Sequence, residues 1–174
     1  AFPLQWREEG LLYAALQPLT ASDLFFRTDT GETLTLDDSA SATPSAAISP
    51  DGRFIAYAND ETGREEIYVR RFPDGQTRWR VSDSGGEFPR WTADGGALYF
   101  QAHDRILKVP VDTGGEVFVA GEPELIARLP RPGGFLSRLY DVMPDESSLV
   151  LAEHERPDAP ALVLLTGLHE RLAD

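Results

Sequence analysis

Cysteine is absent from the sequence, so a disulfide framework, a thiolate zinc site and a cysteine nucleophile are all excluded. No run of about 18 apolar residues is present, and we expect no segment that inserts into a membrane. Methionine occurs once, at Met143, and the chain starts at Ala1 without an initiator methionine or a signal-peptide pattern. We therefore expect the 174 residues to come from a longer or processed protein.

Basic residues are also scarce, because 16 Lys and Arg stand against 29 Asp and Glu and give a formal net charge of −13 at pH 7. A charge of this sign disfavours binding to the phosphates of nucleic acids and to anionic membrane surfaces. We expect no nucleic-acid partner. The hydrophobic content of 41% is typical of a chain that folds around a buried core and argues against disorder.

A turn of similar chemistry recurs along the chain, each time between two short apolar segments. Its glycine position is occupied by Gly10, Gly52 and Gly95, and by Glu146 in a fourth, less regular copy. Proline, aspartate and glycine favour tight turns because they preset φ, bond to the nearby backbone and accept a positive φ, respectively. The recurring turns therefore predict a series of β-hairpins.

A second hairpin follows the first in three of the units, with turns at residues 29–31, 73–75 and 113–115. Four short strands per unit are typical of a propeller blade. We predict an all-β chain, a β-propeller of four-stranded antiparallel blades with about four blades in a partial ring. The expected blades cover about 1–40, 41–84, 85–130 and 131–174. A β-sandwich would also contain short strands, but it would not predict this regular recurrence of turn chemistry.

Residues 48–57 (ISPDGRFIAY) and 63–69 (GREEIYV) together resemble the TolB-like, or WD-like, β-propeller repeat. Residues 79–91 (WRVSDSGGEFPRW) are similar to a blade junction of propellers that follow bacterial serine/threonine kinase domains. Residues 117–125 and 162–168 are similar to the last two blades of those proteins. The resemblance implies an interaction platform without catalytic residues. It favours a periplasmic or extracytoplasmic location, which the sequence otherwise leaves unknown.

The function that we predict is therefore non-catalytic: a protein- or ligand-binding scaffold, the C-terminal sensor part of a larger bacterial protein. One alternative is a propeller fragment of a hydrolase, either the gating propeller of a prolyl-oligopeptidase-type peptidase or a lactonase-like enzyme. Another is a propeller fragment whose copies assemble into a complete ring. Gene context would separate these alternatives, since the peptidase requires an α/β-hydrolase domain.

Propellers bind partners where loops of several blades converge on one face. The loops expected to form such a surface cover residues 59–64, 101–104 and 153–160. The candidate contact residues in them are Asn59, Asp60, Arg64, His103, Asp104, His154 and Arg156.

Residue types that carry out catalysis are present but are not arranged in a recognisable pattern. The histidines, His103, His154 and His169, show no pairing at metal-ligand spacing, so we predict neither a metal site nor a cofactor. A triad of Ser137, His154 and Asp141 can be written down, but no Gly-x-Ser-x-Gly motif accompanies it. We therefore predict no catalytic residue.

The aspartates of the recurring turns, Asp51, Asp94 and Asp145, could in principle bind calcium. Calcium needs about six to eight oxygen ligands around one point, whereas turns on different blades lie far apart. We therefore predict that these side chains cap their own turns. The glycine pairs of the chain are likewise interpreted as turns instead of phosphate loops, because none of them precedes a helix.

The three tryptophans, Trp6, Trp79 and Trp91, fall on expected strands, and we predict that all three are buried between blades. A basic cluster is expected to form a surface ladder of ion pairs with acidic residues on neighbouring strands. Its members are Arg70, Arg71, Arg78 and Arg80, opposite Glu65 and Glu66.

The fourth unit offers only three strands, and its last apolar segment, residues 161–166, has no expected partner on one side. An open strand edge is a template for pairing with another chain. We therefore expect that two copies of the chain associate through residues 161–166.

Overall fold

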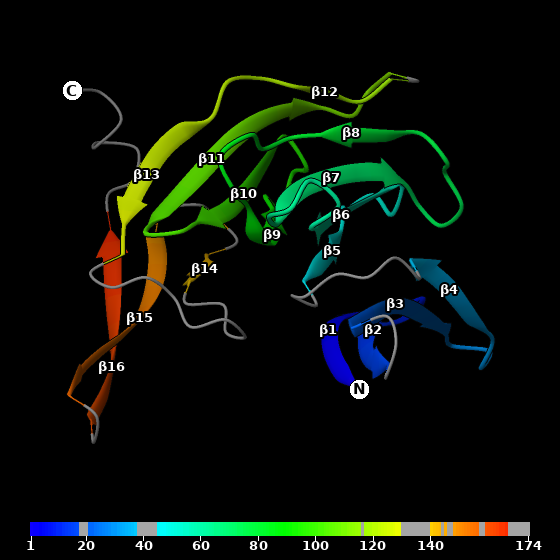
Figure 1. The fold of residues 1–174 in the computed structure, drawn as a ribbon, viewed down its shortest axis with the longest axis horizontal. Coiled ribbons are helices and arrows are strands. Elements are labelled where there is room, and N and C mark those ends of the chain that lie inside the picture. Colours follow the sequence, from blue (N-terminus) through cyan, green and yellow to red (C-terminus); the bar gives the residue numbers. More distant parts are fainter. Residues whose placement is uncertain are drawn as a thin grey trace.

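A computed structural model of the chain describes residues 1–17, 21–37, 45–115, 117–129, 140–143, 145, 148–156 and 159–166. The described residues contain strands and turns but no helix. The strands form four antiparallel sheets, which follow one another along an open arc (Figure 1). The predicted all-β architecture, a partial propeller, is confirmed.

The sheets are numbered here in chain order. Sheet 1 contains β1 (Phe2–Arg7), β2 (Gly10–Gln17), β3 (Ala21–Thr28) and β4 (Thr33–Asp37). Sheet 2 contains β5 (Ala46–Ile48), β6 (Phe54–Asn59), β7 (Glu66–Arg71) and β8 (Arg78–Arg80). Sheet 3 contains β9 (Glu87–Trp91), β10 (Ala97–Ala102), β11 (Arg105–Asp112), β12 (Val119–Ala120) and β13 (Glu124–Arg128). Sheet 4 contains β14 (Tyr140–Val142), β15 (Ser148–Arg156) and β16 (Ala159–Thr166).

Strand order within each sheet follows chain order, so neighbouring strands are joined by hairpins. Sheet 3 departs from this pattern because its outer position is shared: both β12 and β13 pair with β11, at different ends of that long strand. The sequence did not predict the additional strand. Short connections of this kind keep the β-strand contacts local and leave the sheet faces free to pack on neighbouring sheets.

The turn between β5 and β6 is held together by its own side chains. The hydroxyl of Ser49 donates to Asp51 Oδ1 over 2.6 Å and accepts the amide of Phe54 over 3.0 Å. The amide of Gly52 donates to the carbonyl of Ser49, and Gly52 has a φ of 72°, in the region that favours glycine.

The turn between β9 and β10 repeats this network with a threonine. The hydroxyl of Thr92 donates to Asp94 Oδ1 over 2.6 Å and accepts the amide of Ala97 over 2.9 Å. Gly95 has a φ of 75°. The predicted turn-capping role is thus confirmed for Asp51 and Asp94, and the shared geometry explains why the same residue types recur at this spacing.

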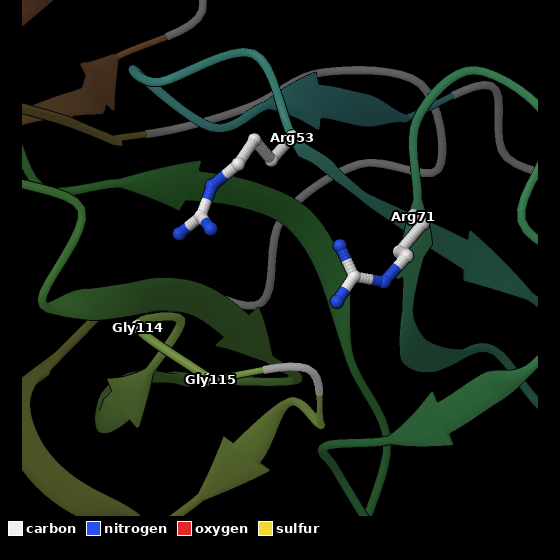
Figure 2. A pocket seen from close by; sticks show the side chains of 4 residues that line it. All are labelled: Arg53, Arg71, Gly114 and Gly115. Atoms are coloured by element: carbon white, nitrogen blue, oxygen red, sulfur yellow. The ribbon is translucent and has the colours of Figure 1, made fainter.

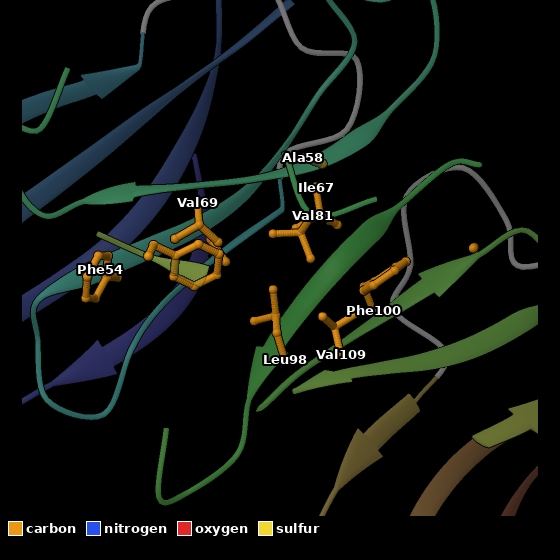
Figure 3. Close-up of a cluster of buried hydrophobic side chains, with 11 residues drawn as sticks. Phe54, Ala58, Ile67, Val69, Val81, Leu98, Phe100 and Val109 are labelled. Atoms are coloured by element: carbon orange, nitrogen blue, oxygen red, sulfur yellow. The ribbon is translucent and has the colours of Figure 1, made fainter. Parts of the chain in front are cut away.

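The second strand of sheet 2 is buried on both of its faces. Phe54, Ala56 and Ala58 pack into a core shared with sheet 3 (Figure 3), whereas Ile55 and Tyr57 pack into a core shared with sheet 1. Successive side chains of a strand point to opposite faces, so one apolar run supplies two cores. This accounts for the absence of an apolar/polar alternation in β6 and in the equivalent strand β10, where every residue is buried.

Polar contacts join sheet 1 to sheet 2 near their first strands. Gln5 accepts the amide of Ile48 through Oε1 over 2.7 Å and donates from Nε2 to the carbonyl of the same residue over 3.3 Å. Arg7 donates to the carbonyls of Ser49 and Pro50 over 2.9 and 3.2 Å. Both side chains therefore replace the strand partner that β5 lacks on that side.

Sheets 2, 3 and 4 are joined in a similar way. The indole N–H of Trp91 donates to the carbonyl of Ala47 over 3.0 Å, and the hydroxyl of Tyr140 donates to the carbonyl of Phe88 over 2.6 Å. The first strand of each sheet is therefore connected to the first strand of the next. These bonds position the sheets around a common axis.

The prediction for the tryptophans is confirmed for two of the three. Trp79 and Trp91 pack against the core between sheets 2 and 3. Trp6 is 79% exposed, and its predicted burial is wrong. It lies opposite Leu11 on the face of sheet 1 that points away from sheet 2, and no other described sheet covers that face.

The predicted ladder of ion pairs is wrong for Arg70, which is only 7% exposed. Its guanidinium donates to the carbonyls of Pro73 and Gly75 in the same hairpin and to the carbonyl of Leu36 in sheet 1. A buried cation is tolerated here because carbonyl oxygens satisfy its donors. Arg70 therefore ties sheet 2 to sheet 1.

Arg78 of the cluster forms an ion pair, but with a different partner from those predicted. Arg78 pairs with Glu61 over 2.7 Å, and Glu66 pairs over 2.6 Å with Arg64, which lies in the connection before β7. The strand register explains the difference, because Arg78 lies directly opposite Arg70 in the ladder between β7 and β8. Like charges at opposed positions repel, so the two side chains turn to other acceptors.

Candidate binding site

The hairpins divide the connections of the propeller between two faces. Strands reverse direction at each hairpin, so the connection after the second strand of a sheet lies at the opposite end from those after the first and third. We call the face with the connections after the second strands the hairpin face. The face with the connections after the first and third strands is called the turn face. The turns of neighbouring sheets meet on the turn face: Arg7 bonds to Pro50, and Pro50 Cδ lies 3.7 Å from the position of a Cβ at Gly95.

The predicted contact residues Asn59, Asp60 and Arg64 lie at the β6/β7 connection on the hairpin face. Asn59 is the last residue of β6 and is fully buried, and its Oδ1 accepts the amide of Glu61 over 2.9 Å. Asp60 is partly exposed and Arg64 is exposed. Asn59 therefore shapes the turn, whereas Arg64 is exposed and donates to Glu66 and to the carbonyl of Asp83.

The sequence analysis placed Glu66 in a surface ladder of ion pairs, but the structure buries this side chain at the hairpin-face end of sheet 2. It is fully buried, pairs with Arg64 through Oε1, and accepts the hydroxyl of Ser82 and the amide of Gly85 through Oε2. The hydroxyl of Ser82 also accepts the amide of Ile67 over 2.8 Å. One carboxylate therefore holds the segment that leads from sheet 2 to sheet 3. The acidic pair before an apolar strand was visible in the sequence, but its partners were not.

His103 and Asp104 form the tight turn between β10 and β11, because Gln101 and Ala102 belong to β10. His103 is exposed with a φ of 55°, and Asp104 pairs with Arg128 of β13 over 3.2 Å. The connection therefore consists of two residues, His103 and Asp104, and not of the predicted four-residue loop over 101–104.

Glu87 begins β9 at the same end of sheet 3 and lies opposite Gln101 in the strand register. Burial raises the pKa of this carboxyl, and the nearby charge of His103 lowers it by less. Gln101 Oε1 is buried and has no hydrogen-bond partner among the described residues. A protonated Glu87 would be a donor at this position.

His154 and Arg156 do not lie on a loop, so the expected loop over residues 153–160 is wrong. Both belong to β15, in which His154 pairs with Pro160 and Arg156 with Ala159 of β16. The apolar residues that follow in β16 allow the hairpin to extend further than the polar composition suggested. The other two residues of interest, Ser137 and His169, lie outside the described residues. Asp141 pairs with Arg90 over 3.1 Å.

A cavity of about 730 Å³ lies on the turn face between sheets 2 and 3, lined by Arg53, Arg71, Gly114 and Gly115. Figure 2 shows the side chain of Arg53, from the turn before β6, and that of Arg71, from the end of β7, on either side of the same space. Arg53 follows the turn of Asp51, and Arg71 is the last residue of β7. The cavity is wide open to solvent.

The phenyl ring of Phe54 lies beside both cations of the cavity. The guanidinium carbons of Arg53 and Arg71 lie 5.7 and 5.3 Å from the ring centroid. The same ring contacts Phe118 at 5.8 Å and Trp79 at 6.3 Å between centroids. The two arginines therefore lie beside a buried aromatic cluster between sheets 2 and 3.

Sequence reasoning assigned Arg71 to a surface ladder and the glycine pair to a plain turn, so it missed this cavity. The positions of these residues in the repeat could have indicated the cavity. Arg53 lies in the turn after the first strand of sheet 2, and Arg71 ends the third strand of that sheet. Gly114 follows the third strand of sheet 3. These are all turn-face positions. Within the described part of the chain, no group of three His, Cys, Asp or Glu residues could hold a metal ion. No helix in that part is long and apolar enough to cross a membrane.

Solved structures with a similar fold include TolB from Acinetobacter baumannii, with a TM-score of 0.66 over 91% of this chain at 15% sequence identity. The chain has a TolB-like β-propeller fold. A TolB candidate from Agrobacterium tumefaciens matches 67% of the chain with a TM-score of 0.50 and 23% identity. A functionally unknown protein from Desulfotomaculum acetoxidans matches 92% with a TM-score of 0.54 and 12% identity.

The TolB-like chain spans only part of these proteins, covering 38%, 46% and 56% of their respective lengths. No protein-family model matches it, and no curated protein sequence matches it significantly. At these identities the likeness concerns the fold. Function must therefore be argued from the surfaces of this chain.

Proposed function

We propose that the chain is a non-catalytic recognition module of a larger bacterial protein and that it binds a protein or small ligand at the faces of its propeller. The TolB-like fold supports the proposal, because its hairpins bring connections from several sheets to each face. The similarity of residues 79–91 to kinase-linked propellers makes a serine/threonine kinase the parent protein that we favour.

The observation that carries the proposal is the cavity between sheets 2 and 3. Two cationic side chains, Arg53 and Arg71, line it, and both lie beside the buried ring of Phe54. A few polar groups that converge on one hollow are typical of binding sites. On the hairpin face, Arg64 and His103 are the exposed members of the predicted contact set whose side chains are described, and they provide a second surface.

The experiment that tests the proposal measures binding and turnover in the same samples. The chain is titrated with a panel of peptides, esters and lactones while the fluorescence of its tryptophans is followed, to which Trp79 beside Phe54 contributes. Chromatography then shows whether each compound has been altered. Saturable binding without any chemical change is the expected result. Turnover of an ester, lactone or peptide would favour the hydrolase alternatives and overturn the proposal.

Association between copies is a separate part of the proposal. Sheet 4 has the order β14-β15-β16, so in the described part of the chain β16 pairs on one side only. We expect a second copy to pair with residues 161–166 at this edge. Light scattering over a range of concentrations measures the mass in solution. A monomer at the highest concentration would contradict this association.

A further inference from the structure

We propose that the outer face of sheet 1 binds a further sheet of the propeller repeat, which the parent protein supplies from outside residues 1–174. The outer face is the side of sheet 1 that points away from sheet 2, and no other described sheet packs on it. The side chains of this face that carry the inference are Trp6, Leu11, Tyr13, Phe25 and Arg27. The inference rests on the proposed larger bacterial protein and concerns a surface that does not belong to the cavity.

The strand registers place equivalent residues on one face of sheets 1, 2 and 3. In each sheet a residue of the first strand lies opposite a residue of the second strand. Two positions further along the second strand, the next residue of that face lies opposite the third strand. The equivalent sets are Trp6, Leu11, Tyr13 and Phe25 in sheet 1, Ile48, Ile55, Tyr57 and Tyr68 in sheet 2, and Trp91, Leu98, Phe100 and Leu107 in sheet 3. Each set is apolar or aromatic throughout.

In sheets 2 and 3 this face packs against the preceding sheet of the chain. Ile55 and Tyr57 are buried in the core with sheet 1, and Leu98 and Phe100 are buried in the core with sheet 2. Trp6, on the equivalent face of sheet 1, is 79% exposed. Exposed apolar faces mark interaction surfaces. The partner that fits this one is a sheet like those already seated on the equivalent faces.

The indole of Trp6 indicates where such a sheet would bond. The indole N–H of Trp91 donates to the carbonyl of Ala47, in the first strand of the preceding sheet, over 3.0 Å. Trp6 lies opposite Leu11 as Trp91 lies opposite Leu98, so the two indoles occupy equivalent positions. The acceptor expected for Trp6 is therefore a main-chain carbonyl in the first strand of the covering sheet.

Arg27 provides a second donor on the same face. It lies opposite Leu11, as Arg70 lies opposite Ile55. Arg70 is 7% exposed and donates to the carbonyl of Leu36 in the outer strand of sheet 1, whereas Arg27 is exposed. A sheet on the outer face would bury Arg27 in the same way, and carbonyls of its outer strand would satisfy the guanidinium.

The covering sheet is expected to resemble sheet 2, because Trp6 and Trp91 are the same bulky residue at equivalent positions. The core that receives Trp91 contains Ala56 and Ala58 of sheet 2. Small side chains leave room for a large one on the facing sheet. On both covered faces the preceding sheet belongs to the same chain, and a covalent connection keeps it at a high local concentration. The parent protein, and not a second copy, is therefore the source.

The test compares the whole parent protein with the 174-residue chain by hydroxyl-radical footprinting. Mass spectrometry measures the rate at which each tryptophan is oxidised. Trp6 should be oxidised at least about threefold more slowly in the parent protein, because an aromatic ring inside an interface loses most of its contact with water. Trp91, which already packs against a core, should have the same rate in both proteins.

Arg27→Gln and Arg70→Gln form a matched pair of variants at equivalent positions. In the parent protein each should lower the unfolding midpoint by about 3 °C or more, because each leaves carbonyls inside an interface without their donor. In the 174-residue chain only Arg70→Gln should do so, since water surrounds Arg27 there. A midpoint unchanged by Arg27→Gln in the parent protein would contradict the inference.

The remaining outcomes identify other occupants. Equal oxidation of Trp6 in both proteins would overturn the inference. So would protection of Trp6 in the chain alone that grows with its concentration, because a second copy would then cover the face. Protection in a parent protein without a further copy of the recurring turn would overturn it as well. Footprinting uses no ligand, so each of these results leaves the recognition function to be judged by the panel described above.

Discussion

Sheet 1 and sheet 2 carry similar side chains at equivalent positions, yet they bury them to different extents. Leu11 and Tyr13 of β2 correspond to Ile55 and Tyr57 of β6. In each sheet these residues lie on the face that points away from the next sheet along the chain. In sheet 2 this face packs against sheet 1, and Tyr57 is almost fully buried. In sheet 1 the same face is covered by no other described sheet, and Tyr13 is partly exposed. The burial of these side chains therefore depends on a neighbouring sheet, whereas the formation of the strands depends on the sequence of each strand itself.

The largest expected difference comes from truncating the two equivalent tyrosines. Tyr57→Ala should lower the free energy of unfolding by about 3 to 5 kcal/mol, because it opens a cavity between sheets 1 and 2. Tyr13→Ala should cost about 1 kcal/mol, since it removes mainly a stacking contact with Phe25 at 5.3 Å. Urea unfolding of both variants measures the contrast. Equal losses would show that the outer face of sheet 1 is covered in solution.

A smaller difference is expected between two ion pairs of sheet 2. Glu66→Ala should cost about 2 to 3 kcal/mol, because it leaves the buried hydroxyl of Ser82 and the half-buried amide of Gly85 without their acceptor. Glu61→Ala removes an exposed pair with Arg78 and should cost less than about 1 kcal/mol. The free energies of unfolding of the two variants test this order. Similar values would mean that Glu66 does not hold the segment before sheet 3.

The bonds between sheets 1 and 2 are expected to contribute less again. Gln5→Ala leaves the amide and carbonyl of Ile48 without their side-chain partner and should cost about 1 to 2 kcal/mol. Amide hydrogen exchange should show faster exchange at Ile48, while β10 in sheet 3 stays protected. Uniform acceleration throughout the chain would instead indicate that the four sheets unfold as one unit.

The smallest effects concern two carboxyls, Glu87 of sheet 3 and Glu9 of sheet 1. Burial raises the pKa of Glu87, so its ionisation destabilises the fold once the pH rises above the unfolded value of about 4.3. Glu87→Gln should therefore stabilise the chain slightly at pH 7 and leave it unchanged near pH 4. The Gln101 amide oxygen opposite, which lacks a partner among the described residues, would gain a donor.

Glu9 provides the matched control with the opposite sign. Its own backbone amide and the guanidinium of Arg7 lower its pKa. Its contribution is therefore present above the unfolded pKa and is lost as the pH falls through the lowered value. Glu9→Gln should destabilise the chain slightly at pH 7, an effect that solvent and salt keep small. Thermal unfolding of both variants at pH 4 and pH 7 tests the two signs.

Local chemistry was enough to predict much of the fold. The recurring turn is stabilised by its own residues, such as Ser49 and Asp51, so its sequence reports its structure directly. The apolar runs of β6 and β10 likewise predicted strands, although the reason for their continuity is that each run supplies two cores. These features depend on residues that are close together in the chain.

Features that depend on distant residues could not be predicted in the same way. The burial of Arg70 depends on the carbonyl of Leu36 in another sheet, and the exposure of Trp6 depends on which sheet is its neighbour. The cavity combines Arg53 and Arg71 with a glycine pair that follows more than 40 positions later. Sequence spacing gave the face on which each residue lies, but not the packing that brings them together.

The two-sided packing of β6 also fixes the pairing of that strand with its neighbours. A slip by one residue would exchange the two sides, so that Tyr57 would meet the space now filled by alanines, and Ala56 or Ala58 would face sheet 1. One side would be overfilled and the other left hollow. A misaligned β6 therefore loses packing energy against both neighbours, sheet 1 and sheet 3.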